Sequence, residues 1–246
     1  MVINIFCDAS IDTDAHIACG GCYIVMQNDD RTFVPLYHRL CIQNNATNNS
    51  SEILAIYTGV MEAIKLRQTY PNAIFRLFSD SKISLYGLRD WIKNWIKNSS
   101  LRGTNVLISS SGTPVANQQY FIKIFNVIVD NELCIEFYHQ RGHVGESGGV
   151  SKEKARAQFI KANKVSPELM GIDINLLCQY NHIIDNLTRN AVRQYVDNNK
   201  IIENAHMEPI YPIEYSIHAD MLPVYISCIN KTSVPSRHDF KGGYSQ

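Results

Sequence analysis

Hydrophobic and polar positions in the first 80 residues follow two different periods. Apolar residues gather in three short runs, VINIFC, CGGCYIVM and FVPLYHRLCI, which polar turn residues separate. This pattern predicts three strands in an antiparallel meander. Residues 47–69 change to helical spacing after a Ser/Asn cap, and AIFRLFSD at residues 73–80 predicts a fourth strand.

The rest of the chain alternates between helical and extended patterns. Residues 81–98 predict a helical segment with a break at Gly87, and residues 115–130 predict another helix. LCIEFYHQ, at residues 133–140, predicts a fifth strand, and residues 181 to about 199 predict a last helix. Because strands come first and then alternate with helices, the order predicts an α/β fold with a five-stranded mixed sheet flanked by helices.

Two stretches lie outside this plan. Residues 144–180 form an insertion before the last helix, and residues 201–246 form a C-terminal extension. We therefore expect one catalytic domain over residues 1–200, followed by the extension. Near MLPVYISCI we expect the extension either to add an edge strand or to pack back on the sheet. Its sequence assigns it no role.

The composition is that of an ordinary globular protein. Apolar residues make up 45% of the 246 residues, and 23 basic side chains balance 23 acidic ones, so no whole-molecule field attracts nucleic acid. No apolar run is long enough to span a membrane, and the N-terminus lacks the order of a signal peptide. Seven cysteines scattered through apolar runs fit reduced thiols. We expect a monomeric, cytoplasmic protein.

Acidic residues recur at the ends of the predicted elements. Asp8 follows the first strand, Asp80 ends the fourth, Glu52 falls in the first turn of the first helix, and Asp185 lies in the last helix. Taken singly, each is typical of a solvated surface acid. Converging carboxylates, however, are the hard ligands that Mg2+ prefers. Two such ions about 4 Å apart stabilise both the attacking and the leaving oxygen of a phosphodiester displacement.

The residues around these acids form motifs in a fixed order. The motifs are FCDAS at 6–10, TNNSSEILA at 47–55, FSDSKISLYGLRDWIKNW at 78–95, EFYHQRGHVG at 136–145 and NHIIDNLTRNAV at 181–192. Together with Gly20 and Gly21, which open the second strand, they resemble the type 1 ribonuclease H family. The resemblance covers most of the first 200 residues. It implies a ribonuclease H-like fold.

The resemblance also implies an activity and a site. The family hydrolyses the RNA strand of RNA–DNA hybrids internally, with two divalent ions, and leaves a 5′-phosphate and a 3′-hydroxyl. By this resemblance the catalytic carboxylates are also the metal ligands, for Mg2+ or, as a substitute, Mn2+: Asp8, Glu52, Asp80 and Asp185. The substrate is then an RNA–DNA hybrid duplex.

A histidine completes the expected catalytic set. The resemblance implies that His143 is a mobile histidine that assists proton transfer or product departure. A histidine on a glycine-flanked loop, with a pKa near neutrality, independently fits that task. His139 is the competitor, but it lies within the predicted strand and not after Gly142. We therefore predict His143 as the catalytic histidine.

The polar cluster Thr47, Asn48 and Asn49 has two interpretations. The plain one is a helix cap, because Asn and Thr accept hydrogen bonds from free first-turn amides. The resemblance implies that this cluster grips phosphate and the minor groove of the hybrid, where the 2′-hydroxyl distinguishes RNA from DNA. We carry this role over to Thr47, Asn48 and Asn49, and to Ser81.

The chain departs from the family after the tryptophan-bearing helix. Family members with a basic protrusion are dense in lysine there, whereas residues 93–115 contain few basic groups. The insertion instead contains SKEKARAQFIKANK, residues 151–164, which predicts a basic helix with Ser151 as its N-cap. We expect Lys154, Arg156 and Lys161 of this helix to contact phosphates. An ordinary solvated helix is the alternative.

Several other interpretations stay open. A fold of this kind can carry a nuclease for another structured or single-stranded nucleic acid, or a non-catalytic nucleic-acid-binding module. Cys19 and Cys22 have zinc-like spacing, but no second pair of ligands lies at a suitable distance, which favours a half-buried strand. Trp91 and Trp95, four residues apart in a predicted helix, favour packing over stacking on a base.

Overall fold

The computed structural model describes residues 1–142, 144, 149–198, 205–207, 217 and 219–229. Its strands are β1 (Val2–Asp12), β2 (Ile17–Gln27), β3 (Phe33–Asn44), β4 (Ile74–Ser79), β5 (Ile135–His139) and β6 (Ala205–Met207). Its α-helices are α1 (Asn48–Thr69), α2 (Lys82–Tyr86), α3 (Ile92–Leu101), α4 (Gln118–Asp130), α5 (Lys152–Asn163), α6 (Ile174–Asn198) and α7 (Leu222–Ile229). Three short helical segments are η1 (Gly87–Trp91), η2 (Pro167–Met170) and η3 (Ala219–Met221).

The strands form one mixed sheet in the order β5-β4-β1-β2-β3-β6. β1, β2 and β3 pair antiparallel, and β4 and β5 then pair parallel on the other side of β1. This arrangement confirms the predicted five-stranded mixed sheet, and β6 adds a short parallel strand beside β3. The register of β1 with β4 places Cys7 opposite Ser79. Asp8 and Asp80 each follow these partners by one residue, so the parallel pairing brings them to the same level.

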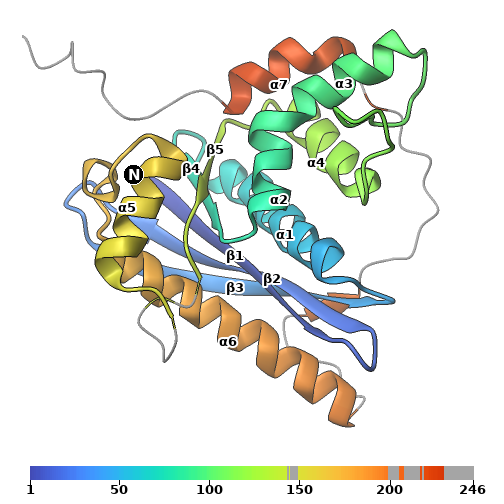
Figure 1. Cartoon of the computed structure of the whole chain (residues 1–246). Helices are drawn as coiled ribbons and strands as arrows, with labels where there is room; N and C mark the ends of the chain where they lie inside the picture. Colours follow the sequence, from blue (N-terminus) through green and yellow to red (C-terminus); the bar gives the residue numbers. More distant parts are fainter. Residues whose placement is uncertain (143, 145–148, 199–204, 208–216, 218, 230–246) are drawn as a thin grey trace, which may run out of the picture.

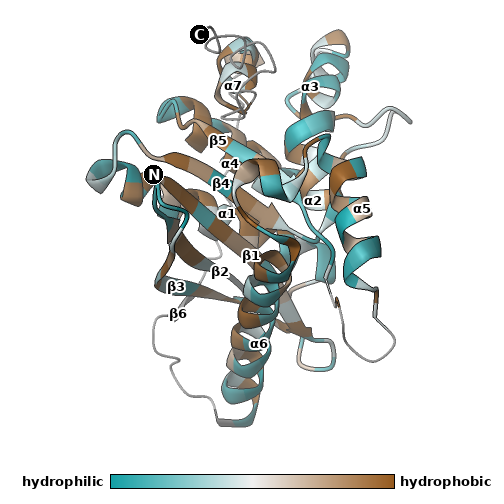
Figure 2. Cartoon of the chain, turned by 90° about the vertical axis from the view of Figure 1, so that its left-hand side faces the viewer, coloured by the Kyte–Doolittle hydropathy of each residue, from teal (hydrophilic) through white to brown (hydrophobic). Residues whose placement is uncertain are grey.

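Helices cover both faces of the sheet. Figure 1 shows α6 along one face, with α1, α2, α3 and α4 on the other. The side chains of β1 alternate between these two layers. Ile3 and Ile5 join the core cluster that includes α1, whereas Phe6 joins the cluster that includes α6. The strands are therefore hydrophobic on both faces, as their brown colour in Figure 2 shows.

The N-terminus of α1 is fixed by its cap and by its close approach to β2. The Thr47 side chain accepts a hydrogen bond from the Ser50 amide at 3.2 Å, and the Ser50 side chain accepts one from the Thr47 amide at 2.8 Å. A Cβ atom at Gly20 would lie 2.8 Å from the backbone nitrogen of Ala55. Gly20 therefore lets the first turns of α1, which carry Glu52, lie directly on β2.

The insertion contains the predicted basic helix and is anchored to the sheet. Ser151 caps α5 by accepting from the Lys154 amide at 3.3 Å. Beyond α5, the Met170 carbonyl accepts from the Arg76 guanidinium at 2.9 Å. Arg76 is also paired with Glu136 at 3.1 Å, and both side chains are buried. The insertion is thus held by a buried ion pair of β4 and β5.

The α7 part of the extension packs back against α4, on the face of the sheet that α1 covers. MLPVYISCI forms η3 and α7, so the expected edge strand at this segment was wrong, because a short apolar run does not distinguish strand from helix. The Tyr225 ring is fully buried, stacks on Phe125 at 4.5 Å between ring centroids, and its hydroxyl donates to the Leu88 carbonyl at 2.9 Å. Burial of this ring makes α7 part of the main core cluster.

The structure tests the predicted break at Gly87 and the predicted start of the last helix. The break at Gly87 is confirmed as the π-helical segment η1 between α2 and α3. The last helix begins at Ile174, ahead of the predicted start at Asn181. None of the helices in the described ranges has the length and hydropathy needed to cross a membrane.

Candidate metal centre

Three carboxylates from three elements meet at one point. Asp8 lies in β1, Asp80 directly follows β4, and Glu52 lies near the start of α1. Each offers one oxygen, and these oxygens all lie within 4.8 Å of one another. The parallel pairing of β1 with β4 aligns the two aspartates, and the packing of α1 on the sheet adds the glutamate. We call these three residues the carboxylate cluster.

Burial and mutual repulsion disfavour the charged forms of Asp8 and Glu52 in the carboxylate cluster. Asp8 is 6% exposed. Its burial, with the nearby charges of Asp80 and Glu52, raises the pKa of Asp8 well above its usual value. Burial, with Asp80 and Asp185, raises the pKa of Glu52 to about 8. A divalent cation at this position would reverse both effects, because it stabilises the charged form of every carboxylate.

The Glu52 side chain also favours a bound cation at this position. Its Oε2 atom is buried and has no hydrogen-bond partner among the described residues. A buried carboxylate oxygen is costly unless something compensates it. An oxygen-only set of carboxylates fits Mg2+ or Mn2+ and does not resemble the thiolate and imidazole sets that hold structural zinc. The residues present therefore fit a hard divalent cation.

Asp185 lies close to the carboxylate cluster but is not one of its three members. It lies in α6 and is 8% exposed, and its charge contributes to the raised pKa of Asp8 and of Glu52. Both its oxygens accept hydrogen bonds from Arg189, one helical turn later, at 2.8 and 2.6 Å. The structure thus brings three of the four predicted ligands together and pairs the fourth with a cation.

Of the two candidate histidines, His139 is among the described residues and His143 is not. His139, the last residue of β5, is 4% exposed, and its Nε2 lies 3.2 Å from the Asp80 carbonyl oxygen. Burial, together with the positive charges of Lys82 and Arg89 among others, lowers the pKa of His139 to about 4. His139 is therefore neutral at pH 7.

The predicted substrate-binding residues lie at two element starts. Thr47, Asn48 and Asn49 are exposed at the beginning of α1, the end that also carries Glu52. The Thr47 side chain serves as the helix cap. Ser81 precedes α2, and its hydroxyl donates to the Ser84 hydroxyl at 2.9 Å. Asn48 and Asn49 are thus the exposed members of this group whose side chains are not used as the helix cap.

The predicted contacts on α5 fall into separate environments. Lys154, Arg156 and Lys161 are all exposed. The Arg156 guanidinium donates to both oxygens of Glu168, at 2.7 and 3.0 Å, so its charge is paired. Lys161 instead lines a cavity between α2 and α5 with a volume of about 440 Å³. We call this cavity the α2–α5 pocket.

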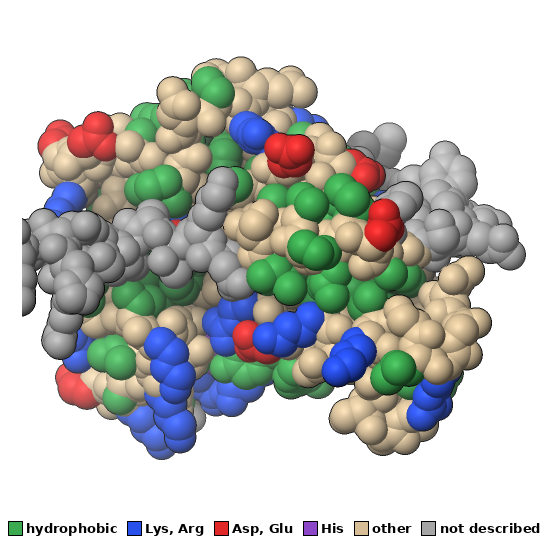
Figure 3. Space-filling model, turned by 90° about the horizontal axis from the view of Figure 1, so that it is seen from above, with side chains coloured by type: hydrophobic (Ala, Val, Ile, Leu, Met, Phe, Trp, Pro, Cys, Tyr) green, Lys and Arg blue, Asp and Glu red, His purple; other side chains and the backbone are tan. Residues whose placement is uncertain are grey.

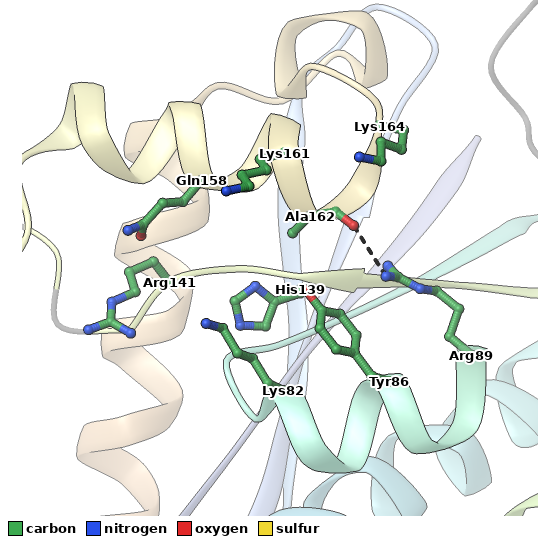
Figure 4. Close-up of a pocket in the computed structure, with 9 residues that line it drawn as sticks. All are labelled: Lys82, Tyr86, Arg89, His139, Arg141, Gln158, Lys161, Ala162 and Lys164. Atoms are coloured by element: carbon green, nitrogen blue, oxygen red, sulfur yellow. Dashed lines mark hydrogen bonds between the residues drawn. The ribbon is translucent and has the colours of Figure 1, made fainter. Parts of the chain in front are cut away.

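The α2–α5 pocket was not predicted from the sequence. Besides Lys161, its basic lining residues are Lys82, Arg89, Arg141 and Lys164. Figure 4 shows these side chains arranged around His139 and Tyr86. They come from three segments that are distant in the sequence, so no local spacing pattern signals them.

The cysteine and tryptophan pairs have structural roles. Cys19 belongs to the core cluster on the α6 side of the sheet and Cys22 to the cluster on the α1 side, so they point to opposite faces of β2. They cannot chelate one ion together. Trp95 is 9% exposed and packs edge-on against Phe121 at 5.0 Å, which fits the predicted packing role. Trp91 is half-exposed, at 39%.

Comparisons with known proteins agree with this geometry. A family model described as RNase H matches residues 1–166. Ribonuclease HI of Rickettsia prowazekii is 26% identical over 112 residues, covering 46% of this chain and 64% of that protein. Ribonuclease H of Thermosynechococcus vestitus is 29% identical over 129 residues, covering 50% of this chain and 72% of that protein. The alignments thus span about two-thirds of the length of these relatives.

Solved structures show a partial likeness. One is described as a type 1 RNase H with the type 2 active-site motif; it is 16% identical, with a TM-score of 0.43, and covers 85% of this chain and 87% of its own. Another, an RNase H1 solved in complex with an RNA/DNA hybrid, is 13% identical, with a TM-score of 0.40, and covers 68% of this chain and 94% of its own.

Proposed function

This chain belongs to the RNase H family, and we propose that it is an endonuclease that hydrolyses the RNA strand of RNA–DNA hybrids. The proposed products carry a 5′-phosphate and a 3′-hydroxyl. The observation that carries the proposal is the carboxylate cluster, in which three acids from three elements converge, with one oxygen of each within 4.8 Å of the others. The relatives named ribonuclease H supply the substrate class.

The proposed metal ligands are Asp8, Glu52 and Asp80, with Asp185 as the fourth. Mg2+ is the proposed ion, two per site, and Mn2+ is its substitute. When bound, the ions supply the positive charge that stabilises the attacking and leaving oxygens of the phosphodiester. The protein's own part is to hold the ligands in place. The Ala9 amide donates to the Asp8 Oδ1 atom at 2.8 Å, which fixes the orientation of that carboxylate.

His143 stays the proposed group for proton transfer or product departure. The environment of His139 supports this choice, because a buried imidazole with a pKa of about 4 is neutral at pH 7 and is not a general acid there. Its Nε2 also contacts the Asp80 carbonyl oxygen, so it helps to position the chain at that metal ligand. The proposed substrate contacts are Thr47, Asn48, Asn49 and Ser81 beside the site, with Lys154, Arg156 and Lys161 on α5.

A cleavage assay tests the proposal. We expect the full chain to cut a labelled RNA–DNA hybrid internally with Mg2+, and EDTA to abolish the cleavage. Asp80→Asn should lower the rate by at least about a hundredfold, because it removes a charge that the cation requires. Asp197→Asn, an exposed aspartate of α6, is the matched control and should keep the activity.

The choice of substrate separates the proposal from its rivals. Hybrid, duplex DNA, duplex RNA and single strands are offered at equal concentration. Faster cleavage of another nucleic acid would replace the hybrid by that substrate. Binding of the hybrid without any Mg2+-dependent cleavage would instead identify a non-catalytic binding module. The monomeric state, the cytoplasmic location and the domain boundary at residue 200 stay predictions, which sedimentation, microscopy and truncation respectively test.

A further inference from the structure

The α2–α5 pocket lies directly beside the carboxylate cluster. Lys82 and Tyr86 of α2 form one wall and Lys161 of α5 forms the other, with His139 between them (Figure 4). His139 links the pocket to the metal centre, because its Nε2 lies 3.2 Å from the Asp80 carbonyl oxygen. Any group in the pocket is therefore next to the proposed site of cleavage.

The charged residues among the described lining of the α2–α5 pocket are all basic. Its basic residues are Lys82, Arg89, Arg141, Lys161 and Lys164, and no acidic residue is among its described lining residues. Within the described parts of the chain, Arg89 is the one member of this set with an ion pair, to Asp90 at 3.0 Å. For the remaining four cations, no carboxylate among the described residues lies within ion-pair distance. A cavity lined by one sign of charge focuses the field and attracts ions of the opposite sign.

Arg89, unlike the other four basic residues, joins the two walls of the pocket through hydrogen bonds within the described ranges. Its guanidinium donates to the Asn163 side chain at 3.1 Å and to the Ala162 carbonyl at 3.2 Å, which ties the end of α5 to η1. Asn163 in turn bonds the backbone of His139, with its oxygen accepting from the amide at 2.9 Å and its nitrogen donating to the carbonyl at 2.7 Å. The two walls are thus fixed to each other, so the pocket is built before any ligand arrives.

We propose that the α2–α5 pocket binds a phosphate group of the nucleic-acid backbone adjacent to the cleaved position. The inference deepens the proposed function and rests on it for the identity of the substrate. Lysine and arginine are the residues that bind phosphate oxygens, and the pocket offers four of them with no acidic partner in the described ranges, more donors than one phosphate needs. The pocket thereby replaces part of the basic surface that the chain lacks in residues 93–115.

The pocket also distinguishes Lys161 from the other basic residues of α5 as a phosphate contact. Arg156 is paired with Glu168, and Lys152 and Lys154 do not line the pocket, whereas Lys161 does. On the face drawn in Figure 3, Lys and Arg side chains gather in the lower part of the view, with few acidic side chains among them. If the hybrid is bound at the pocket, replacing Lys161 weakens binding and replacing Lys152 does not. If the whole basic helix attracts the hybrid, replacing either lysine weakens binding.

Binding measurements on the full chain test the pocket. Asp8→Asn is the background, so that affinity for a labelled hybrid is measured in Mg2+ without cleavage. Lys82→Gln with Lys161→Gln removes one charge from each wall. We expect this pair to weaken binding at least about tenfold and to lower the slope of log affinity against log salt by about 1. Equal melting temperatures and circular dichroism spectra check that the variants are folded.

The matched control is Lys152→Gln with Arg193→Gln, which removes the same charge from exposed sites of α5 and α6 outside the pocket. We expect it to change the affinity by less than about twofold. An equal loss in both pairs would overturn the pocket in favour of diffuse attraction, and no loss in the pocket pair would also overturn it. Neither result depends on cleavage, so failure of the pocket and failure of the proposed activity are separate outcomes.

Inorganic pyrophosphate separates the backbone phosphate from a small ligand. We expect millimolar pyrophosphate to compete with the hybrid on the Asp8→Asn chain and to lose that effect in the Lys82→Gln, Lys161→Gln pair. Magnesium is held in excess so that chelation does not contribute. If pyrophosphate stabilises the chain against heat through this pocket but leaves hybrid binding unchanged, the pocket serves a free phosphate compound and the proposal is wrong.

Discussion

Arg189 donates hydrogen bonds to both carboxylate oxygens of Asp185, at 2.8 and 2.6 Å. Asp185 is the proposed fourth metal ligand, and in this arrangement a cation of the protein occupies its oxygens. A metal ion that uses Asp185 must therefore compete with Arg189. The same guanidinium also lowers the negative potential at the carboxylate cluster, since Asp185 acts on both Asp8 and Glu52.

Removal of Arg189 should lower the Mg2+ concentration that cleavage requires. The Arg189 side chain is 42% exposed, so solvent screens the pair and its contribution is about 1 kcal/mol. Arg189→Gln should therefore reduce the Mg2+ concentration for half-maximal cleavage about fivefold. Arg193→Gln, an exposed arginine further along α6, should leave it unchanged. An unchanged or higher Mg2+ requirement in Arg189→Gln would contradict competition.

Glu52 should make the metal-free protein less stable as the pH rises. Its pKa of about 8 in the folded chain exceeds the ordinary value of 4.5, so the folded state holds a proton that the unfolded state has lost between these values. Stability therefore falls from pH 4.5 to pH 8. In EDTA, Glu52→Gln should raise the free energy of unfolding by about 2 kcal/mol at pH 8 and by nothing at pH 4.

Urea unfolding at the two pH values measures this difference. Asp14→Asn, an exposed acid of the β1–β2 turn, is the control and should show no such pH dependence. Saturating Mg2+ should remove the advantage of Glu52→Gln, because the ion stabilises the charged form that the wild type provides. A Glu52→Gln advantage of equal size at pH 4 and pH 8 would show a cause other than titration.

Gly142 should be required for the position of Asp80. A Cβ atom added at Gly142 would collide with the Oδ2 atom of Asp80. Gly142→Ala should therefore displace a proposed metal ligand, raise the Mg2+ requirement at least about tenfold and leave secondary structure intact. Asn94→Ala, at an exposed position of α3, is the control and should keep the Mg2+ dependence of the wild type. Normal Mg2+ dependence in Gly142→Ala would show that Asp80 has room to move.

Tyr225 should contribute to the stability of the whole domain. Its hydroxyl donates to the buried Leu88 carbonyl at 2.9 Å, so Tyr225→Phe should cost about 1 kcal/mol by leaving that acceptor without its donor. Ser227→Ala, at an exposed site on the same helix, should cost less than about 0.5 kcal/mol. Truncation after residue 200 should cost about 3 kcal/mol or more, because it uncovers Phe125. Thermal unfolding measures all three.

Local pattern predicted much of the fold. The alternation of apolar residues in β1 and β2 and the capped helical spacing of α1 depend on neighbours in the chain, so the sequence indicates them directly. The secondary structure of the C-terminal extension was not determined by its local pattern. The apolar run around Tyr225 is compatible with strand or helix, and its stacking on Phe125 decided for a helix.

The sequence by itself determined which carboxylates stand in β1, directly after β4 and near the start of α1, because each position follows from a local strand or helix signal. The predicted end of the first strand at Asp8 was wrong, since β1 continues to Asp12 through its pairing with β2. Only the tertiary structure decided how the carboxylates are used. The pairing of Asp185 with Arg189 depends on side-chain direction on α6. The α2–α5 pocket depends on packing between segments far apart in the chain, through Arg89 and Asn163. Electrostatic energy depends on distance in space, which no spacing along the chain records.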